Sequence, residues 1–150
     1  MSTSVEAYFD QDHGEHPIVV RRDEDMDALI DALLAQPFSN SMATLYVAER
    51  PLNAAGVPDH EFAIGVDAED GVGSLWYMGA GGGWYSQGAR SQRDEVYYCY
   101  MGNDRDFPAD SVIPLELVRQ AAKEFLANAG ARPVAVAWQL CTPGNAAPAA

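Results

Sequence analysis

The chain has 150 residues, of which 22 are acidic and 9 are basic, and its formal net charge is −13 at pH 7. This length suits one domain with its own core, and a hydrophobic content of 48% excludes disorder over the whole chain. The negative charge argues against binding to nucleic acid or to an anionic membrane, because phosphates would be repelled. It favours a cationic partner, although solubility alone is an equally good reason for acidity.

The expected location is the cytoplasm. The N-terminus lacks a basic segment followed by an apolar run, so no secretory signal is predicted. No apolar run approaches the length of a membrane span. The two cysteines, Cys99 and Cys141, are too few for a disulfide framework, and Cys99 is expected to be a packed thiol.

The N-terminal half predicts short strands around one helix. Between Met26 and Leu34, apolar residues recur at the i, i+3, i+4 and i+7 spacing of an amphipathic helix. Acidic residues at its start suit the positive end of the helix dipole. Strands are predicted from β-forming residues and alternation at 5–9, 18–21, 43–48, 62–66 and 72–78.

The C-terminal half predicts strands at 96–101 and 134–140 and a second helix at 114–129. Strand 96–101 is apolar on both faces, so it is expected in the centre of the sheet. Pro114 suits a first helical position and Gly130 suits a helix terminator.

These elements predict an α+β fold. Consecutive hairpins favour a mostly antiparallel sheet of about six or seven strands, with two helices packed on one face. Residues 102–110 are expected to form a loop. A single domain is expected over residues 1–141, followed by a flexible tail rich in Pro, Ala and Gly over 142–150.

Two sequence patterns that contain histidine resemble a metal site and a catalytic triad, but neither pattern is complete enough to predict one. His13 and His16 have metal-ligand spacing, yet no third and fourth ligand stands out, so a solvated loop is preferred. Asp59, His60 and Glu61 resemble a catalytic triad in letters only, because adjacent residues of a strand point to opposite faces. No catalytic, metal or cofactor site is therefore predicted.

The glycine-rich segment 79–83 invites comparison with a nucleotide-binding loop. Such a loop needs a helix directly behind it to present backbone amides to phosphate, whereas Trp84, Tyr85 and Ser86 follow here. Tight bending or close approach of another chain explains the glycines better. A small-molecule sensor or enzyme that uses this segment is kept as the alternative function, and a structural adaptor as a third.

A binding surface is the preferred interpretation of the acidic and aromatic residues. Acidic clusters on the first helix and near residue 105 would steer a basic protein toward the chain, and large aromatic residues beside a flexible glycine loop would anchor it. The predicted partner-binding residues are Asp25, Asp27, Asp31, Gly82, Gly83, Trp84, Tyr85, Asp104 and Asp106.

A family resemblance runs from residue 43 to residue 140. It is carried by segments that recur in order: 71–77 (GVGSLWY), 82–88 (GGWYSQG), 97–102 (YYCYMG), 107–108 (FP), 113–115 (IPL), 118–119 (VR), 124–126 (EFL) and 132–133 (RP), with Val136, Trp138 and Gln139. Together they resemble the first-numbered immunity protein family of bacterial polymorphic toxin systems. The N-terminal 40 residues do not match it well.

The resemblance implies a role that the residues alone do not give. Proteins of this family are encoded beside secreted toxins, often ones with a nucleic-acid deaminase domain, and neutralise them by binding in the producer's cytoplasm. No catalytic residues are carried over, and no cofactor is implied. The expected partner is therefore a basic, nucleic-acid-acting toxin whose active site is blocked.

Overall fold

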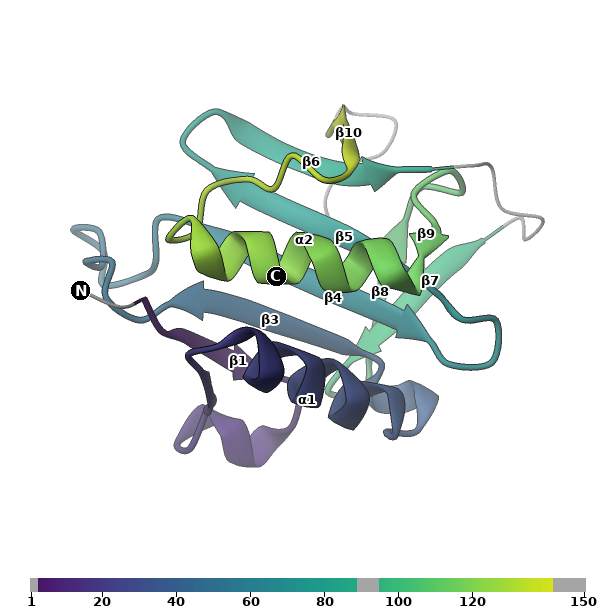
Figure 1. Ribbon diagram of the computed structural model, residues 1–150, viewed down its shortest axis with the longest axis horizontal. Coiled ribbons are helices and arrows are strands. Elements are labelled where there is room, and N and C mark those ends of the chain that lie inside the picture. Colours follow the sequence, from purple (N-terminus) through teal and green to yellow (C-terminus); the bar gives the residue numbers. More distant parts are fainter. Residues whose placement is uncertain (1–2, 89–94, 142–150) are drawn as a thin grey trace.

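The computed structural model describes residues 3–88 and 95–141, which form three layers (Figure 1). The first layer holds helices α1 (Asp23–Leu34) and α2 (Leu115–Ala127). The second is an eight-stranded sheet, and the third is a pair of strands, β7 (Val96–Tyr100) and β8 (Asn103–Phe107). The eight strands are β1 (Val5–Tyr8), β2 (Ile18–Val20), β3 (Met42–Val47), β4 (Glu61–Asp67), β5 (Val72–Gly79), β6 (Gly82–Gln87), β9 (Ile113–Pro114) and β10 (Ala137–Leu140). The predicted tail 142–150 lies outside the described residues.

The main sheet is antiparallel, in the order β10-β6-β5-β4-β3-β1-β2, and β9 pairs with β5. This confirms the α+β class and the mostly antiparallel sheet. The strand count is higher than the predicted six or seven, because three segments without a clear alternating pattern also pair: β6, β8 and β9. Two short 3-10 helices, η1 (Gln11–Gly14) and η2 (Phe38–Asn40), follow β1 and α1.

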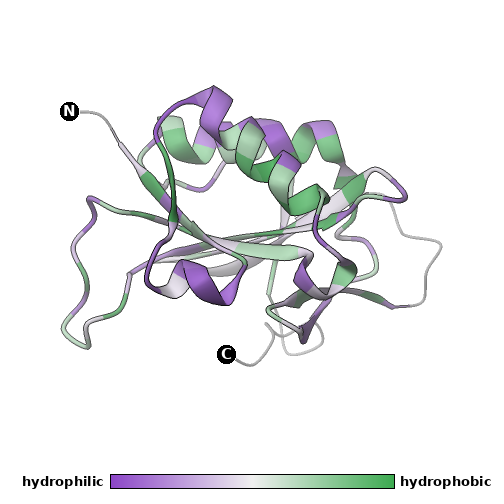
Figure 2. Cartoon of the chain, turned by 90° about the horizontal axis from the view of Figure 1, so that it is seen from below, coloured by the Kyte–Doolittle hydropathy of each residue, from purple (hydrophilic) through white to green (hydrophobic). Residues whose placement is uncertain are grey.

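Both helices lie on one side of the sheet and turn their apolar faces toward it (Figure 2). From α1 the fully or nearly fully buried residues include Met26 and Ile30, and from α2 they include Phe125. The ring of Phe125 stacks on Phe62 of β4, with centroids 4.7 Å apart. Tyr77 of β5 then donates a hydrogen bond of 2.8 Å to the carbonyl of Gly130, which ties the end of the helical layer to the sheet.

The prediction that strand 96–101 lies in the centre of the main sheet was wrong. It forms β7, whose one partner among the described strands is β8, and it packs on the sheet face opposite the helices. The ring of Tyr98 lies directly over Gly65, where an added Cβ would come within 2.4 Å of ring atoms. Its hydroxyl is 2.8 Å from the hydroxyl of Ser74. The strand is apolar on both faces because the main sheet covers one face and η2 lies beside the other, where Phe38 meets Tyr97 edge-on.

The predicted flexible loop around residue 83 is instead a strand. Gly79 pairs with Gly82 across a two-residue turn, and β6 continues as the partner of β5 and β10. Residues 102–110, also predicted as a loop, contain β8. In both segments cross-strand pairing supplies the stability that local propensity does not, since glycine and charged residues are poor strand formers.

Candidate partner-binding surface

One face of the main sheet is only partly covered by the described residues. Residues paired across antiparallel strands point to the same side, so the register defines rows of side chains on the face away from the helices. The row of Gly65 and Ser74 lies under β7. The next two rows are what we call the open face: Tyr8, Thr44 and Trp76, then Val19, Glu6, Tyr46, Glu61 and Met78.

A carboxylate is held in a defined orientation in the middle of the open face. Glu61 accepts a hydrogen bond of 2.6 Å from the hydroxyl of Tyr46 and one of 3.1 Å from the indole nitrogen of Trp76. Burial, together with the negative charge of Glu61, raises the pKa of Tyr46, so the phenol stays protonated and remains a donor. Glu61 is therefore oriented before any partner arrives.

Aromatic and polar groups surround this carboxylate. Tyr8 meets Tyr46 edge-on at 6.0 Å between ring centroids. The hydroxyl of Thr44 is 3.1 Å from that of Tyr100 on β7, and Arg105 of β8 lies 5.7 Å above the Tyr100 ring. The open face thus combines rings, hydroxyls and carboxylates, and its aromatic side chains are of the kind enriched in protein interfaces.

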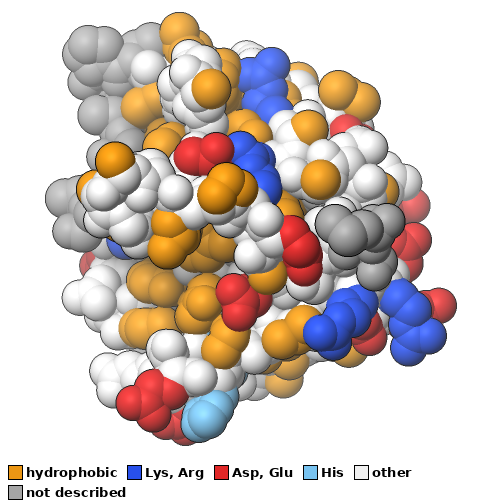
Figure 3. Space-filling model, turned by 90° about the vertical axis from the view of Figure 1, so that its left-hand side faces the viewer, with side chains coloured by type: hydrophobic (Ala, Val, Ile, Leu, Met, Phe, Trp, Pro, Cys, Tyr) orange, Lys and Arg blue, Asp and Glu red, His pale blue; other side chains and the backbone are white. Residues whose placement is uncertain are grey.

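A hollow of about 470 Å³ lies at one end of the open face. Its floor is sheet and its wall is the loop of residues 48–60, which projects on the side away from the helices (Figure 2). Figure 3 shows hydrophobic side chains around a hollow on this side of the molecule, with acidic side chains among them. The lining residues are Glu6, Tyr8, Tyr46, Val47, Ala48, Arg50, Leu52 and Pro58.

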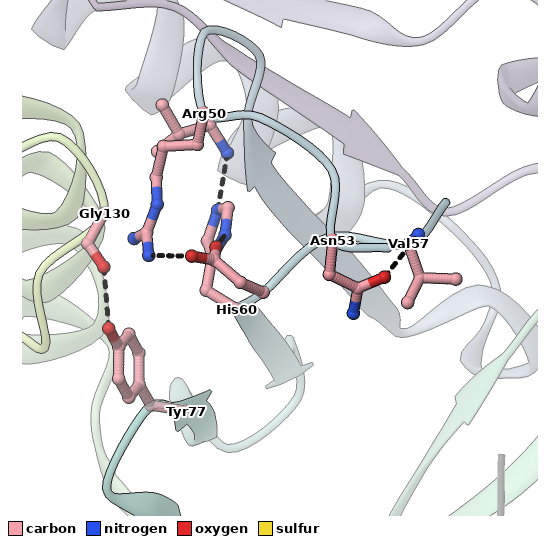
Figure 4. A network of polar contacts seen from close by, with 8 residues as sticks. Arg50, Asn53, Val57, His60, Tyr77 and Gly130 are labelled. Atoms are coloured by element: carbon pink, nitrogen blue, oxygen red, sulfur yellow. Dashed lines mark hydrogen bonds and ion pairs between the residues drawn. The ribbon is translucent and has the colours of Figure 1, made fainter. Parts of the chain in front are cut away.

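The wall is held by a chain of polar contacts (Figure 4). Arg50 donates to Asp59 at 2.9 Å, and Asp59 accepts at 2.9 Å from Nδ1 of His60. Nε2 of His60, a ring 1% exposed, accepts at 2.8 Å from the amide of Val47. Because Nε2 accepts this hydrogen bond, the proton of the neutral His60 ring is on Nδ1. Burial lowers the pKa of His60, and the bond from His60 and the guanidinium of Arg50 lower the pKa of Asp59.

Acidification is expected to destabilise the fold through His60. Its pKa is lower in the folded than in the unfolded chain, so the unfolded chain binds the proton first. Its contribution to stability is therefore complete above about pH 6.5 and is lost as the pH falls from there toward the folded-state pKa. Urea denaturation between about pH 7.5 and pH 5 should show this decline. The His60→Gln variant, which cannot titrate, should show a flatter profile; parallel profiles would contradict the assignment.

The acidic residues predicted on the first helix already have partners within the chain. Asp27 pairs with Arg119 at 3.0 Å and with Lys123 at 2.8 Å, and Asp31 pairs with Arg119 at 2.5 Å. These cations lower the pKa of Asp27, with Lys123 the larger influence. Asp25 accepts hydrogen bonds from two backbone amides in front of α1. This cluster therefore links α1 to α2 and caps α1, on the side of the molecule opposite the open face.

The four predicted residues of the glycine and tryptophan segment are split between the two faces of β6. Trp84 faces the helices and lies 6.2 Å from the ring of Tyr77, with Arg132 4.2 Å above it. Tyr85 is fully buried on the other face, 5.0 Å from Trp76. Gly83 makes room for Trp76, since an added Cβ would lie 2.2 Å from its ring. Gly82 has a φ of +128° at the hairpin turn.

Asp104 and Asp106 lie on β8, where both are exposed. Asp106 is opposite Tyr97 in the register, and Asp104 accepts a hydrogen bond of 3.4 Å from the thiol of Cys99. The predicted residues thus occupy three separate regions: the helical layer, β6 and β8. Which of them touches a partner stays a prediction.

The residues of the open face were missed in the sequence. Strands β1 and β3 were expected, but their outward residues were not considered as a surface. The available signal was alternation: in β1, Val5 and Ala7 are buried, whereas Glu6 and Tyr8 between them are partly exposed. Only the strand order places these two beside Tyr46 and Glu61.

Comparison with known proteins places the chain in a family. The model of the family described as Immunity protein Imm1 matches residues 14–140. A search of curated proteins finds no match. No helix in the described part of the chain is both long and apolar enough to cross a membrane.

Proposed function

This chain belongs to the Imm1 family of immunity proteins, and we propose that it protects its producer by binding and neutralising a cognate secreted bacterial toxin. The family match over residues 14–140 carries the proposal. It includes both helices, the loop wall of the hollow and the open face except Glu6 and Tyr8, since the whole of β1 precedes residue 14. We place this activity in the cytoplasm and assign it to residues 1–141 acting as one domain.

The proposed mode of action is binding without catalysis. The groups with the most catalytic potential have structural roles: His60 and Asp59 hold the loop wall, and Glu61 is bonded by Tyr46 and Trp76. Burial raises the pKa of the Cys99 thiol, which disfavours the thiolate nucleophile. No cofactor is needed for neutralisation by occlusion.

The proposed partner is a basic, nucleic-acid-acting toxin, of the deaminase type, blocked at its active site. A site that handles nucleic acid attracts phosphates, so its rim is expected to be basic. A net charge of −13 and carboxylates on an aromatic surface are complementary to such a rim. We favour the open face for this contact, because its carboxylates lie among rings, whereas Asp27 and Asp31 of α1 are paired with Arg119 and Lys123.

The protein is expected to form a tight 1:1 complex with the toxic domain encoded beside its gene. Light scattering after co-expression gives the stoichiometry, and calorimetry gives the affinity. Raising the salt concentration from about 0.05 to 0.5 M should weaken the complex, since added ions screen exposed charges. Co-expression should also restore growth to cells that produce the toxin. Failure both to bind and to protect would reject the proposed function; binding that is insensitive to salt would reject only its electrostatic part.

A further inference from the structure

We propose that the hollow at the end of the open face receives one basic side chain of the toxin, an arginine or a lysine. This inference rests on the proposed function and names a point of contact within it. It follows from three features of the hollow: its charge, its rings and its wall.

The charge in the lining comes from Glu6, and Glu61 adds a second carboxylate beside the hollow, since the two flank Tyr46 in one row of the sheet. They belong to β1 and β4 with β3 between them, so two strand spacings of about 4.8 Å separate their backbones. Glu6 lines the hollow and has no hydrogen-bond or ion-pair partner among the residues that the structure describes. The positive charge of Arg50 is balanced by Asp59 at 2.9 Å. The hollow is therefore net negative, with an unpaired carboxylate at its edge.

The rings suit a cation as well. Tyr8 and Tyr46 both line the hollow, and their planes are inclined at 65°. Arginine and lysine bind favourably over aromatic faces within about 6 Å of the ring centre, more so when water is excluded. A guanidinium or ammonium group on Tyr46 would thus meet the ring and the carboxylate of Glu6 together.

The wall accommodates the aliphatic part of such a side chain. Leu52, which is 60% exposed, and Pro58 border the hollow on the loop. Long basic side chains pack their methylene groups on apolar surface while the charged end reaches a polar partner. A volume of about 470 Å³ is ample for one side chain. The polar contacts that hold the 48–60 loop keep this wall in place without the partner.

The test compares removal of one charge inside and outside the hollow. Glu6→Gln is expected to raise the Kd for the toxic domain encoded beside the gene roughly tenfold, and Glu6→Lys more. Glu116→Gln removes the same charge from an exposed position on α2 and should leave the Kd within about twofold. Equal effects of Glu6→Gln and Glu116→Gln would overturn the inference and attribute the affinity to overall charge.

Two further measurements identify the contact itself. Tyr46→Phe keeps the ring and should bind more tightly than Tyr46→Leu, with circular dichroism melting used to select conditions in which both variants are folded. Alanine substitution of each basic residue of the toxin, combined with Glu6→Gln, should yield one residue whose effect is strongly non-additive. If no toxin residue couples to Glu6, the inference fails. If the wild-type protein does not bind the toxin at all, the proposed function fails instead.

Discussion

The Phe125→Ala variant is expected to lose about 3–5 kcal/mol of unfolding free energy, because it leaves a cavity between the helical layer and the main sheet. The Phe125 side chain is fully buried. It stacks on Phe62 at 4.7 Å and is close to Tyr77 at 6.5 Å and His60 at 6.1 Å. Phe62, Tyr77 and His60, which holds the loop wall, would therefore all lose packing in this variant.

Urea denaturation followed by circular dichroism measures this loss. The control is Phe125→Leu, which keeps most of the apolar volume and is expected to lose less than about 1.5 kcal/mol. Similar small losses for both variants would show that α2 does not pack on β4 as described. The alanine variant should bind the toxin more weakly only at temperatures where part of it is unfolded. This comparison separates a loss of stability from a loss of contact with the toxin.

The Trp76→Ala variant is expected to weaken the toxin complex by about 2 kcal/mol or more, roughly 30-fold in Kd, with most of the change in the dissociation rate. Trp76 is partly exposed on the open face and helps to orient Glu61. Large, partly exposed aromatic residues next to fixed polar groups are the usual anchors of interfaces. Removal of this ring would also release Glu61 from one of its two donors.

Trp84→Ala is the matched control, since Trp84 belongs to the adjoining strand and faces the helices. Both variants are compared by surface plasmon resonance at a temperature where both are folded. Faster dissociation with Trp76→Ala alone supports the open face. Faster dissociation with Trp84→Ala alone would support the segment predicted from the sequence. The indole N–H resonances of the unmutated protein provide a second readout: Trp76 should shift on toxin binding, whereas Trp138, on the helical side, should not.

Much of the secondary structure was predictable because it depends on local patterns. Both helices were predicted, since their apolar residues follow the helical period. Gly130, with a φ of +89°, follows the end of α2 as expected for a terminating glycine. Strand β6 was missed because Gly82 and Gly83 have no side chains that could show alternation. A glycine is needed at position 83 because the ring of Trp76, on the neighbouring strand, occupies the space where a Cβ would lie.

The charge was predictable in amount but not in arrangement. The excess of carboxylates is a property of composition, and a cationic partner stays a hypothesis drawn from it. Asp27 and Arg119 are 92 residues apart, yet their ion pair joins α1 to α2. No local pattern indicates that this pair forms, because helix packing alone brings the two side chains together.

By itself, the sequence determined the α+β class, both helices, most strands and the resemblance to immunity proteins, since these depend on periodicity and on ordered segments along the chain. Only the tertiary structure decided which carboxylates are paired within the chain and which lie on the open face. Strand order placed Glu6, Tyr46 and Glu61 in one row, and the packing of β7 covered the row of Gly65 and Ser74, two rows away. The physical reason is that a surface is made of side chains from strands distant in sequence, whose neighbours are chosen by register and layer packing.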